Sequence, residues 1–77
     1  MVKPTVVTNS IRSLRFGAGE LTQAELAARI GVTRQTVIAI EQGRYSPTLE
    51  LAFKIARALQ VPLDAVFHYP ETDGDQP

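Results

Sequence analysis

The sequence contains no cysteine and no tryptophan, and only one histidine. Without cysteine the chain can form neither a disulfide nor a thiolate metal site, which suits a reducing compartment. The single histidine, His68, lacks the cluster of ligands that a metal site needs. No set of nucleophile, base and orienting group can be assembled around it. We therefore expect no metal, no cofactor and no enzymatic activity.

Long apolar runs are also missing, since no stretch approaches the roughly 20 residues that a bilayer-spanning helix needs. The first ten residues carry one lysine and few apolar side chains, so they make a poor signal peptide. These features predict a cytoplasmic protein. At 77 residues the chain is long enough for one small domain with one core. A core of this size is marginally stable unless the helices are well capped or a second copy of the chain shares the core.

An excess of charge of one sign is absent as well, because the formal net charge is zero. This value argues at first against a nucleic-acid partner. However, three acidic residues, Glu71, Asp73 and Asp75, follow Tyr69. The chain up to Pro70 carries eight basic and five acidic residues, a net charge of +3. Such a distribution is compatible with DNA binding but does not establish it.

The pattern of apolar residues and breakers predicts five short helices. The first helix is expected over residues 9–16, the second between Thr22 and Gly31, and the third over residues 34–43. A fourth follows Ser46-Pro47, a cap residue and a first-turn proline, and a short final turn covers residues 63–67. The expected inner positions are Ile11 and Leu14; Leu26, Ala27 and Ile30; Val37, Ile40 and Glu41; and Leu49, Ala52, Ile55, Ala56 and Leu59.

The fold class predicted from this pattern is all-α, with a compact five-helix domain over residues 9–69. Residues 1–8 are β-prone but interrupted by Pro4, and we expect them to form an extended arm. Residues 70–77 are expected to form a flexible, disordered acidic tail. No strand pattern competes with the helices outside the arm.

The second and third helices have the best local signals. Thr22 and Glu25 have the spacing of a capping box, in which each side chain binds the main-chain N–H of the other residue. Gly31 stands where a helix ends in a left-handed residue, and Thr33 can cap the next helix. The joint Gly31-Val32-Thr33 has the length of a helix-turn-helix joint.

In a helix-turn-helix, the start of the second helix reaches base edges in the major groove. Here that start is Arg34-Gln35-Thr36. Arginine can bind guanine and glutamine can bind adenine through two hydrogen bonds each, and threonine can contact either a polar edge or a thymine methyl. A generic helical hairpin with ordinary polar surface residues would show the same side chains, so the periodicity alone leaves both interpretations open.

Three longer motifs carry a resemblance to a known family: LTQAELA at residues 21–27, GVTRQTV at 31–37 and IEQGRYSP at 40–47. Together with LELAFKIA at 49–56 and VPLDAVF at 61–67, they resemble helix-turn-helix regulators of the phage-repressor and Cro type, the Xre-like group. The resemblance covers residues 9–69 and favours a λ-repressor-like fold that binds double-stranded DNA.

The resemblance implies roles for individual residues. Base-reading positions would be Arg34, Gln35, Thr36, Ile38 and Ala39, and contacts to phosphates would come from Gln23, Thr33, Arg44 and Tyr45. Arg15 would form a structural ion pair with Glu41 and would not contact DNA. For Ile38, which is apolar where many relatives are polar, we favour partial packing over a thymine contact.

The segment between Arg15 and Leu21 is one residue longer than in the common pattern of this group, and we expect Gly17 and Gly19 to absorb the insertion. We also expect a homodimer that binds a near-palindromic operator, with Leu63, Val66, Phe67 and Tyr69 at the interface or closing the core. The same fold serves antitoxins of toxin–antitoxin pairs and controllers of restriction–modification operons. A protein-interaction module without DNA is a further alternative, which the zero net charge supports.

Overall fold

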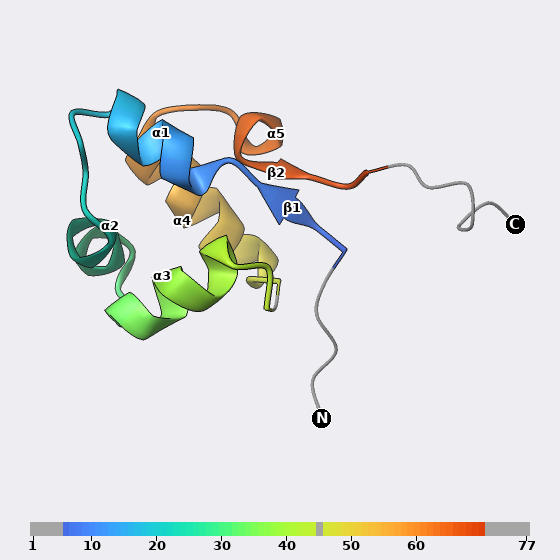
Figure 1. The fold of residues 1–77 in the computed structure, drawn as a ribbon, viewed down its shortest axis with the longest axis horizontal. Coiled ribbons are helices and arrows are strands. Elements are labelled where there is room, and N and C mark those ends of the chain that lie inside the picture. The colour runs from blue at the N-terminus through green and yellow to red at the C-terminus, as the bar shows by residue number, and fades with distance from the viewer. Residues whose placement is uncertain (1–5, 45, 71–77) are drawn as a thin grey trace, which may run out of the picture.

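The computed structural model describes residues 6–44 and 46–70, and within them it contains five helices and one two-stranded ribbon (Figure 1). The elements in chain order are β1 (Thr8–Asn9), α1 (Ile11–Gly17), α2 (Gln23–Ile30), α3 (Arg34–Glu41), α4 (Leu49–Leu59), α5 (Leu63–Val66) and β2 (Phe67–His68). The five predicted helices are therefore confirmed, whereas a strand after the last helix was not predicted. Most of the predicted arm and tail, and Tyr45, lie outside the described residues.

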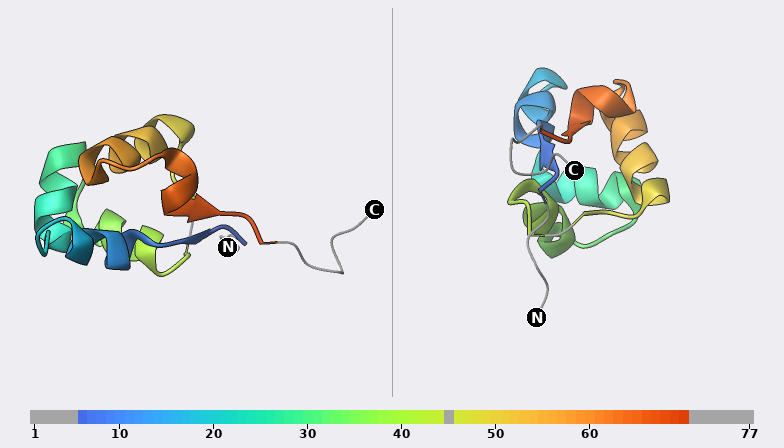
Figure 2. Two further views of the ribbon diagram at one scale, coloured as in Figure 1. Left: turned by 90° about the horizontal axis from the view of Figure 1, so that it is seen from above. Right: turned by 90° about the vertical axis from the view of Figure 1, so that its right-hand side faces the viewer.

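One apolar core holds the helices together. The helix α2 packs against both α3 and α4, and α4 continues into α5, which returns toward α1 (Figures 1 and 2). The side chains that are almost completely buried are Ile11, Leu26, Val37, Ile40, Ile55 and Val66. Each was expected on an inner face except Val66, which closes the core from α5.

Threonine residues cap three of the helices. Thr22, Thr33 and Thr48 each accept a hydrogen bond from the main-chain N–H three residues ahead, at 3.0–3.2 Å. Such a cap stabilises a helix by about 1 kcal/mol, because it satisfies an N–H group that has no partner within the helix. The predicted start of α4 was wrong, since Thr48 and not Ser46 is its cap.

Leu49 is 67% exposed although it was predicted to be buried. Leu49 is the first residue of the helix, one turn before the buried stripe begins at Ala52. The inward period is therefore kept from Ala52 to Leu59, and only its first predicted member lies outside the core.

Four other helix ends differ from prediction by one or two residues. The helix α1 starts at Ile11 because Asn9 belongs to β1, and it ends at Gly17, one residue later than predicted. The helix α5 ends at Val66 because Phe67 belongs to β2. The helix α3 ends at Glu41, before Gly43, whose positive φ of 72° is incompatible with a continued right-handed helix.

The ribbon joins the two ends of the described chain. Thr8 pairs with His68 and Asn9 pairs with Phe67 in antiparallel register, and the two strands run side by side in Figure 2. The Ser10 hydroxyl lies 3.1 Å from His68 Nε2, and the Ser10 N–H donates to the Val66 carbonyl at 2.8 Å. Thr8 and Asn9 therefore form a strand only because a distant segment supplies their partner.

The longest helix among the described residues, α4, has 11 residues, and none of the helices in this part of the chain has the length and apolarity needed to span a bilayer.

Candidate nucleic-acid interface

The joint between α2 and α3 is a tight turn around Gly31. This residue has φ 78° and ψ 32°, and its N–H and that of Val32 both donate to the Ala27 carbonyl at 2.9 and 3.0 Å. The left-handed conformation favours glycine because a Cβ would strain the backbone, although no atom lies within 4 Å of the place that a Cβ would occupy. The predicted end of the helix is confirmed, and the turn delivers Thr33 as the cap of α3.

At the other end of α2 the capping box is complete. The Thr22 N–H donates to Glu25 Oε1 at 2.8 Å, while the Glu25 N–H donates to Thr22 Oγ1 at 3.0 Å. The hydrogen bond from the Thr22 main chain, followed by that from its hydroxyl, lowers the pKa of Glu25 from its ordinary value. The first turn of α2 is therefore stabilised while the Glu25 carboxylate is charged.

Arg34 and Gln35 project from the first turn of α3. Both are exposed, and neither has a hydrogen-bond or ion-pair partner among residues 6–44 and 46–70. Thr36 is half-buried, and its hydroxyl lies 3.1 Å from Thr33 Oγ1. The two side chains with the greatest capacity for paired hydrogen bonds are thus free, and the threonine beside them is already engaged.

The inner face of α3 carries a saturated carboxylate. Arg15 Nε donates to Glu41 Oε2 at 2.6 Å, and Arg15 Nη2 donates to Glu41 Oε1 at 3.2 Å. The amide of Gln23 donates to the same Oε1 at 3.1 Å, and Arg15 Nη1 donates to the Leu21 carbonyl at 3.0 Å. The predicted contact between Arg15 and Glu41 is present, and Gln23 braces α3 through the same group.

Arg15 is only 8% exposed, and each of the paired side chains is 10% exposed. A buried charge is tolerable only when it is paired and hydrogen-bonded, which is the case for both partners here. Because the guanidinium is occupied by Glu41 and Leu21, the geometry supports the prediction that Arg15 acts inside the protein.

The longer loop after α1 is absorbed by two consecutive left-handed residues. Gly19 has φ 81° and Glu20 has φ 59°. The Leu21 N–H donates to the Arg15 carbonyl at 2.9 Å, so the loop ends on the residue that pairs with Glu41. We expected the two glycines to absorb the insertion, but Gly17 remains in α1 and Glu20 takes the second left-handed position.

A groove of about 730 Å³ lies beside these residues, between α1, the start of α2 and α3. Its lining includes Arg12, Arg34 and Gln23. It also includes the ion pair of Arg15 with Glu41 and one further carboxylate, that of Glu20. The guanidinium groups of Arg12 and Arg34 at this open groove are suited to oxygen atoms of an anionic backbone.

The other predicted contact residues differ in how exposed they are. Ile38 and Ala39 are half-buried, so Ile38 has the partial packing that we favoured. Arg44 is exposed beyond the end of α3, and its N–H donates to the Ala39 carbonyl at 3.0 Å. Tyr45 lies outside the described residues.

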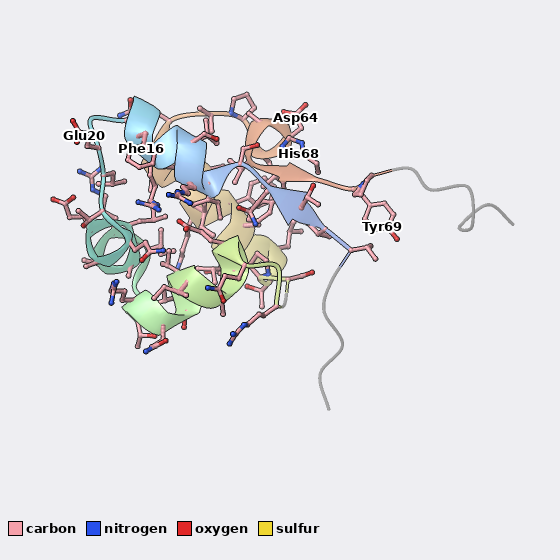
Figure 3. The ribbon with its side chains drawn as sticks, viewed as in Figure 1. Phe16, Glu20, Asp64, His68 and Tyr69 are labelled. Carbon is pink, nitrogen blue, oxygen red and sulfur yellow. The ribbon has the colours of Figure 1, made fainter. Side chains whose placement is uncertain are left out.

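The predicted dimer residues do not form one exposed patch. Val66 has no exposed surface and belongs to the core, so its assignment to an interface was wrong and its alternative role of closing the core is correct. Leu63 and Phe67 are half-buried, and Tyr69 is 70% exposed beyond β2, away from the helices (Figure 3).

Two residues at this surface were missed from the sequence. Arg12 was not recognised, although its position one turn before Arg15 places a second arginine in α1 beside the groove. Asn9 was assigned to the first helix, yet its side-chain amide donates to the Ile40 carbonyl at 2.9 Å. No local signal identifies this contact, because its two residues are 31 positions apart.

A capped helix, a left-handed glycine turn and a second helix with a free polar first turn define a helix-turn-helix protein. The chain belongs to the HTH_3 helix-turn-helix family, whose model matches residues 11–66. It is thereby a transcriptional regulator with a helix-turn-helix DNA-binding domain. The family consists of DNA-binding regulators and not enzymes, which confirms the expectation that the chain is not an enzyme.

Two relatives illustrate the range of the family. The chain is 51% identical over 53 residues to the HTH-type transcriptional regulator MJ0272 of Methanocaldococcus jannaschii, which covers 69% of this chain and 80% of that protein. It is 38% identical over 69 residues to the cryptic phage CTXphi transcriptional repressor RstR of Vibrio cholerae, covering 90% of this chain and 61% of the repressor.

Two solved structures have the same fold. A protein of known structure from Bacteroides fragilis superposes with a TM-score of 0.72 over 80% of this chain and 98% of its own, at 21% identity. The restriction-modification controller protein C.AhdI from Aeromonas hydrophila superposes with a TM-score of 0.65 at 33% identity, over 71% of this chain and 78% of the controller. These likenesses confirm the predicted λ-repressor-like fold.

Proposed function

We propose that this protein is a repressor that binds a near-palindromic operator as a homodimer, with α3 in the major groove. The observation that carries the proposal is the free pair Arg34 and Gln35 at the exposed start of α3. Most other polar groups on α3 are used within the protein, whereas these two have no internal task. Similarity to the phage repressor RstR supports the direction of control.

The proposed base-reading set is Arg34 and Gln35, with Thr36, Ile38 and Ala39 beside them. Arg34 would bind guanine and Gln35 adenine, since each can form two hydrogen bonds with that base. The half-burial of Ile38 and Ala39 limits them to short apolar contacts, of which a thymine methyl is one.

The proposed phosphate contacts flank this set on both sides. Gln23 and Thr33 lie at the starts of α2 and α3, where unpaired main-chain N–H groups favour anions. Arg44 and Tyr45 follow α3, and Arg12 joins the set because it lines the same groove as Gln23. Such contacts supply affinity without sequence choice and make binding dependent on salt.

A single helix of this length reads only a few base pairs, so we propose two copies whose α3 helices lie about 34 Å apart. Tyr69, Leu63 and Phe67 remain the proposed dimer contacts. A protein that binds DNA in this way would act in the cytoplasm, at the nucleoid.

The decisive experiment is selection of bound sequences from a random duplex pool by the full chain, followed by salt titration of the winning sequence. A symmetric motif is expected, and the double variant R34A/Q35A should lose it while still binding DNA weakly. Arg57→Ala on α4 is the matched control, because it removes another exposed cation from outside the groove. An unchanged motif in R34A/Q35A would refute the assignment of base reading.

A second candidate is a controller of a restriction–modification operon, which the similarity to C.AhdI favours. The antitoxin alternative has the same DNA-binding surface. A nuclease gene or a toxin gene beside the coding sequence distinguishes them. A protein-interaction module without DNA predicts no enriched sequence from the pool.

A further inference from the structure

The side chain of Asn9, in β1, connects the start of α1 to the end of α3, which is about 30 residues further along the chain. Its Nδ2 donates to the Ile40 carbonyl at 2.9 Å and lies 3.5 Å from the Glu41 carbonyl. Its Oδ1 accepts from the Ile11 N–H at 3.1 Å, at the start of α1. Both ends of the amide are thus engaged, one with α1 and the other with the last residues of α3.

The end of α3 needs such a partner because the last carbonyl groups of a helix receive no hydrogen bond from an N–H group of the same helix. The Ile38 and Ala39 carbonyls receive the N–H groups of Gln42 and Arg44, each at 3.0 Å. The Gly43 N–H reaches the Ile40 carbonyl, also at 3.0 Å. Within the described part of the chain, the Asn9 amide is the one donor found for the main-chain carbonyl of Glu41.

The main chain of Asn9 is held from the opposite side. It pairs with Phe67 in the β1–β2 ribbon, and the next N–H, that of Ser10, donates to the Val66 carbonyl. The exit of α3 is therefore joined through one residue to the ribbon and to α5, whereas the body of α3 packs chiefly against α2.

We propose that Asn9 is a positioning residue that sets the tilt of α3, and hence the alignment of Arg34 and Gln35 with base edges, by anchoring the end of α3 to the ribbon. The inference rests on the proposed function, because alignment matters only if α3 reads bases. A helix of eight residues is about 12 Å long, so a small displacement of its anchored end moves its free first turn. Bidentate contacts to bases tolerate little such movement.

The alternative role for Asn9 is to cap α1 alone, and the variant Asn9→Asp separates the two. Aspartate keeps the acceptor for the Ile11 N–H, but it has no donor for Ile40. It also brings a negative charge to the carbonyl end of α3, where the helix dipole disfavours it. Asn9→Ser is the second variant, since it removes the amide without adding charge. The matched control is Thr8→Val, which removes a 3.4 Å contact to the His68 carbonyl in the same ribbon without touching α3.

The first measurement is amide hydrogen exchange in the full chain without DNA. In N9D and N9S the amides of Gln42, Gly43 and Arg44 should exchange about tenfold faster relative to those of α2, and in T8V they should not. Unchanged exchange at these three amides would overturn the proposal whatever the DNA results. Unfolding of both N9D and N9S would also overturn it, because Asn9 would then serve the fold as a whole.

The second measurement compares binding of the selected sequence with binding of random duplex. We expect N9D and N9S to lose about five- to tenfold of this ratio. In N9S the affinity for random duplex and the salt slope should stay at the wild-type values, whereas in N9D the added negative charge beside the groove should also weaken binding to random duplex. Faster exchange with an unchanged ratio would refute the positioning role while leaving the proposed function intact. A wild-type protein with no sequence preference would refute the proposed function, and the positioning role with it.

Discussion

Replacement of Arg15 by methionine should destabilise the fold severely. It removes both guanidinium contacts to Glu41 and leaves Gln23 as the remaining side-chain donor to that carboxylate. Breaking a buried pair from one side costs about 3–5 kcal/mol, because the other charge stays buried. For a domain of this size, each kcal/mol lowers Tm by about 4–8 °C, so we expect a fall of at least about 12 °C.

The double variant R15M/E41L tests whether the loss comes from the unpaired charge. It removes both charges, so its loss should be smaller than the sum of the two single losses by at least about 3 kcal/mol. It should remain below wild type by about 1–3 kcal/mol, because the Leu21 carbonyl loses its donor. Urea unfolding followed by circular dichroism, with equal m-values for all four proteins, measures the cycle. Additive single effects would refute the ion-pair argument.

The other predictions concern the helix-turn-helix and its termini. Gly31→Ala should lower the free energy of unfolding by about 1–2 kcal/mol, because alanine is strained in the left-handed conformation. No atom lies within 4 Å of the new Cβ, so a larger loss of stability in thermal melts would contradict this explanation. Thr33→Ala should cost about 1 kcal/mol, with Thr33→Ser as the control that restores the cap of α3. Because the pKa of Glu25 is lowered in the folded protein, its stabilising effect is complete above the unfolded pKa and disappears as the pH falls through the folded one. Urea unfolding between pH 6 and pH 3 should therefore show a smaller loss for Glu25→Gln than for wild type, and parallel curves would exclude this cause. Arg44→Ala should weaken binding to all duplexes alike and flatten the salt slope by about one unit, whereas a changed operator preference would assign it to base reading.

The helices and the joint could be predicted because their signals are local. The capping box at Thr22, the glycine at Gly31 and the cap at Thr33 each depend on residues no more than four positions apart. The contact between Arg15 and Glu41 joins distant residues, and it came from the family resemblance and not from spacing.

The predicted start of α4 was wrong because the sequence offers two possible helix starts close together. Ser46-Pro47 and Thr48 both have the composition of a helix start, and the period of the apolar residues allowed either. The structure uses Thr48, whose hydroxyl accepts from the Leu51 N–H. Leu49 fits the apolar period of α4, but it lies in the first turn, beyond the part of the helix that the core covers.

The ribbon and the Asn9 contact were beyond prediction for a physical reason. A two-residue strand has no period of its own, and it forms only when Phe67 and His68 arrive from the other end of the chain. Asparagine at a helix start is ordinarily a cap, so its second hydrogen bond to Ile40 had no separate signal.

The pairing of Thr8 with His68 also orders events during synthesis of the chain. A ribosome releases the chain from its N-terminal end, so α1 to α4 can pack while β1 still lacks its partner strand. The register of Asn9 against Phe67 forms only after the last helix has emerged. We therefore expect nascent chains that stop before Phe67 to be helical, but without the strand pairing that holds Asn9 beside the end of α3. Operator preference would then be among the last properties that the growing polypeptide acquires.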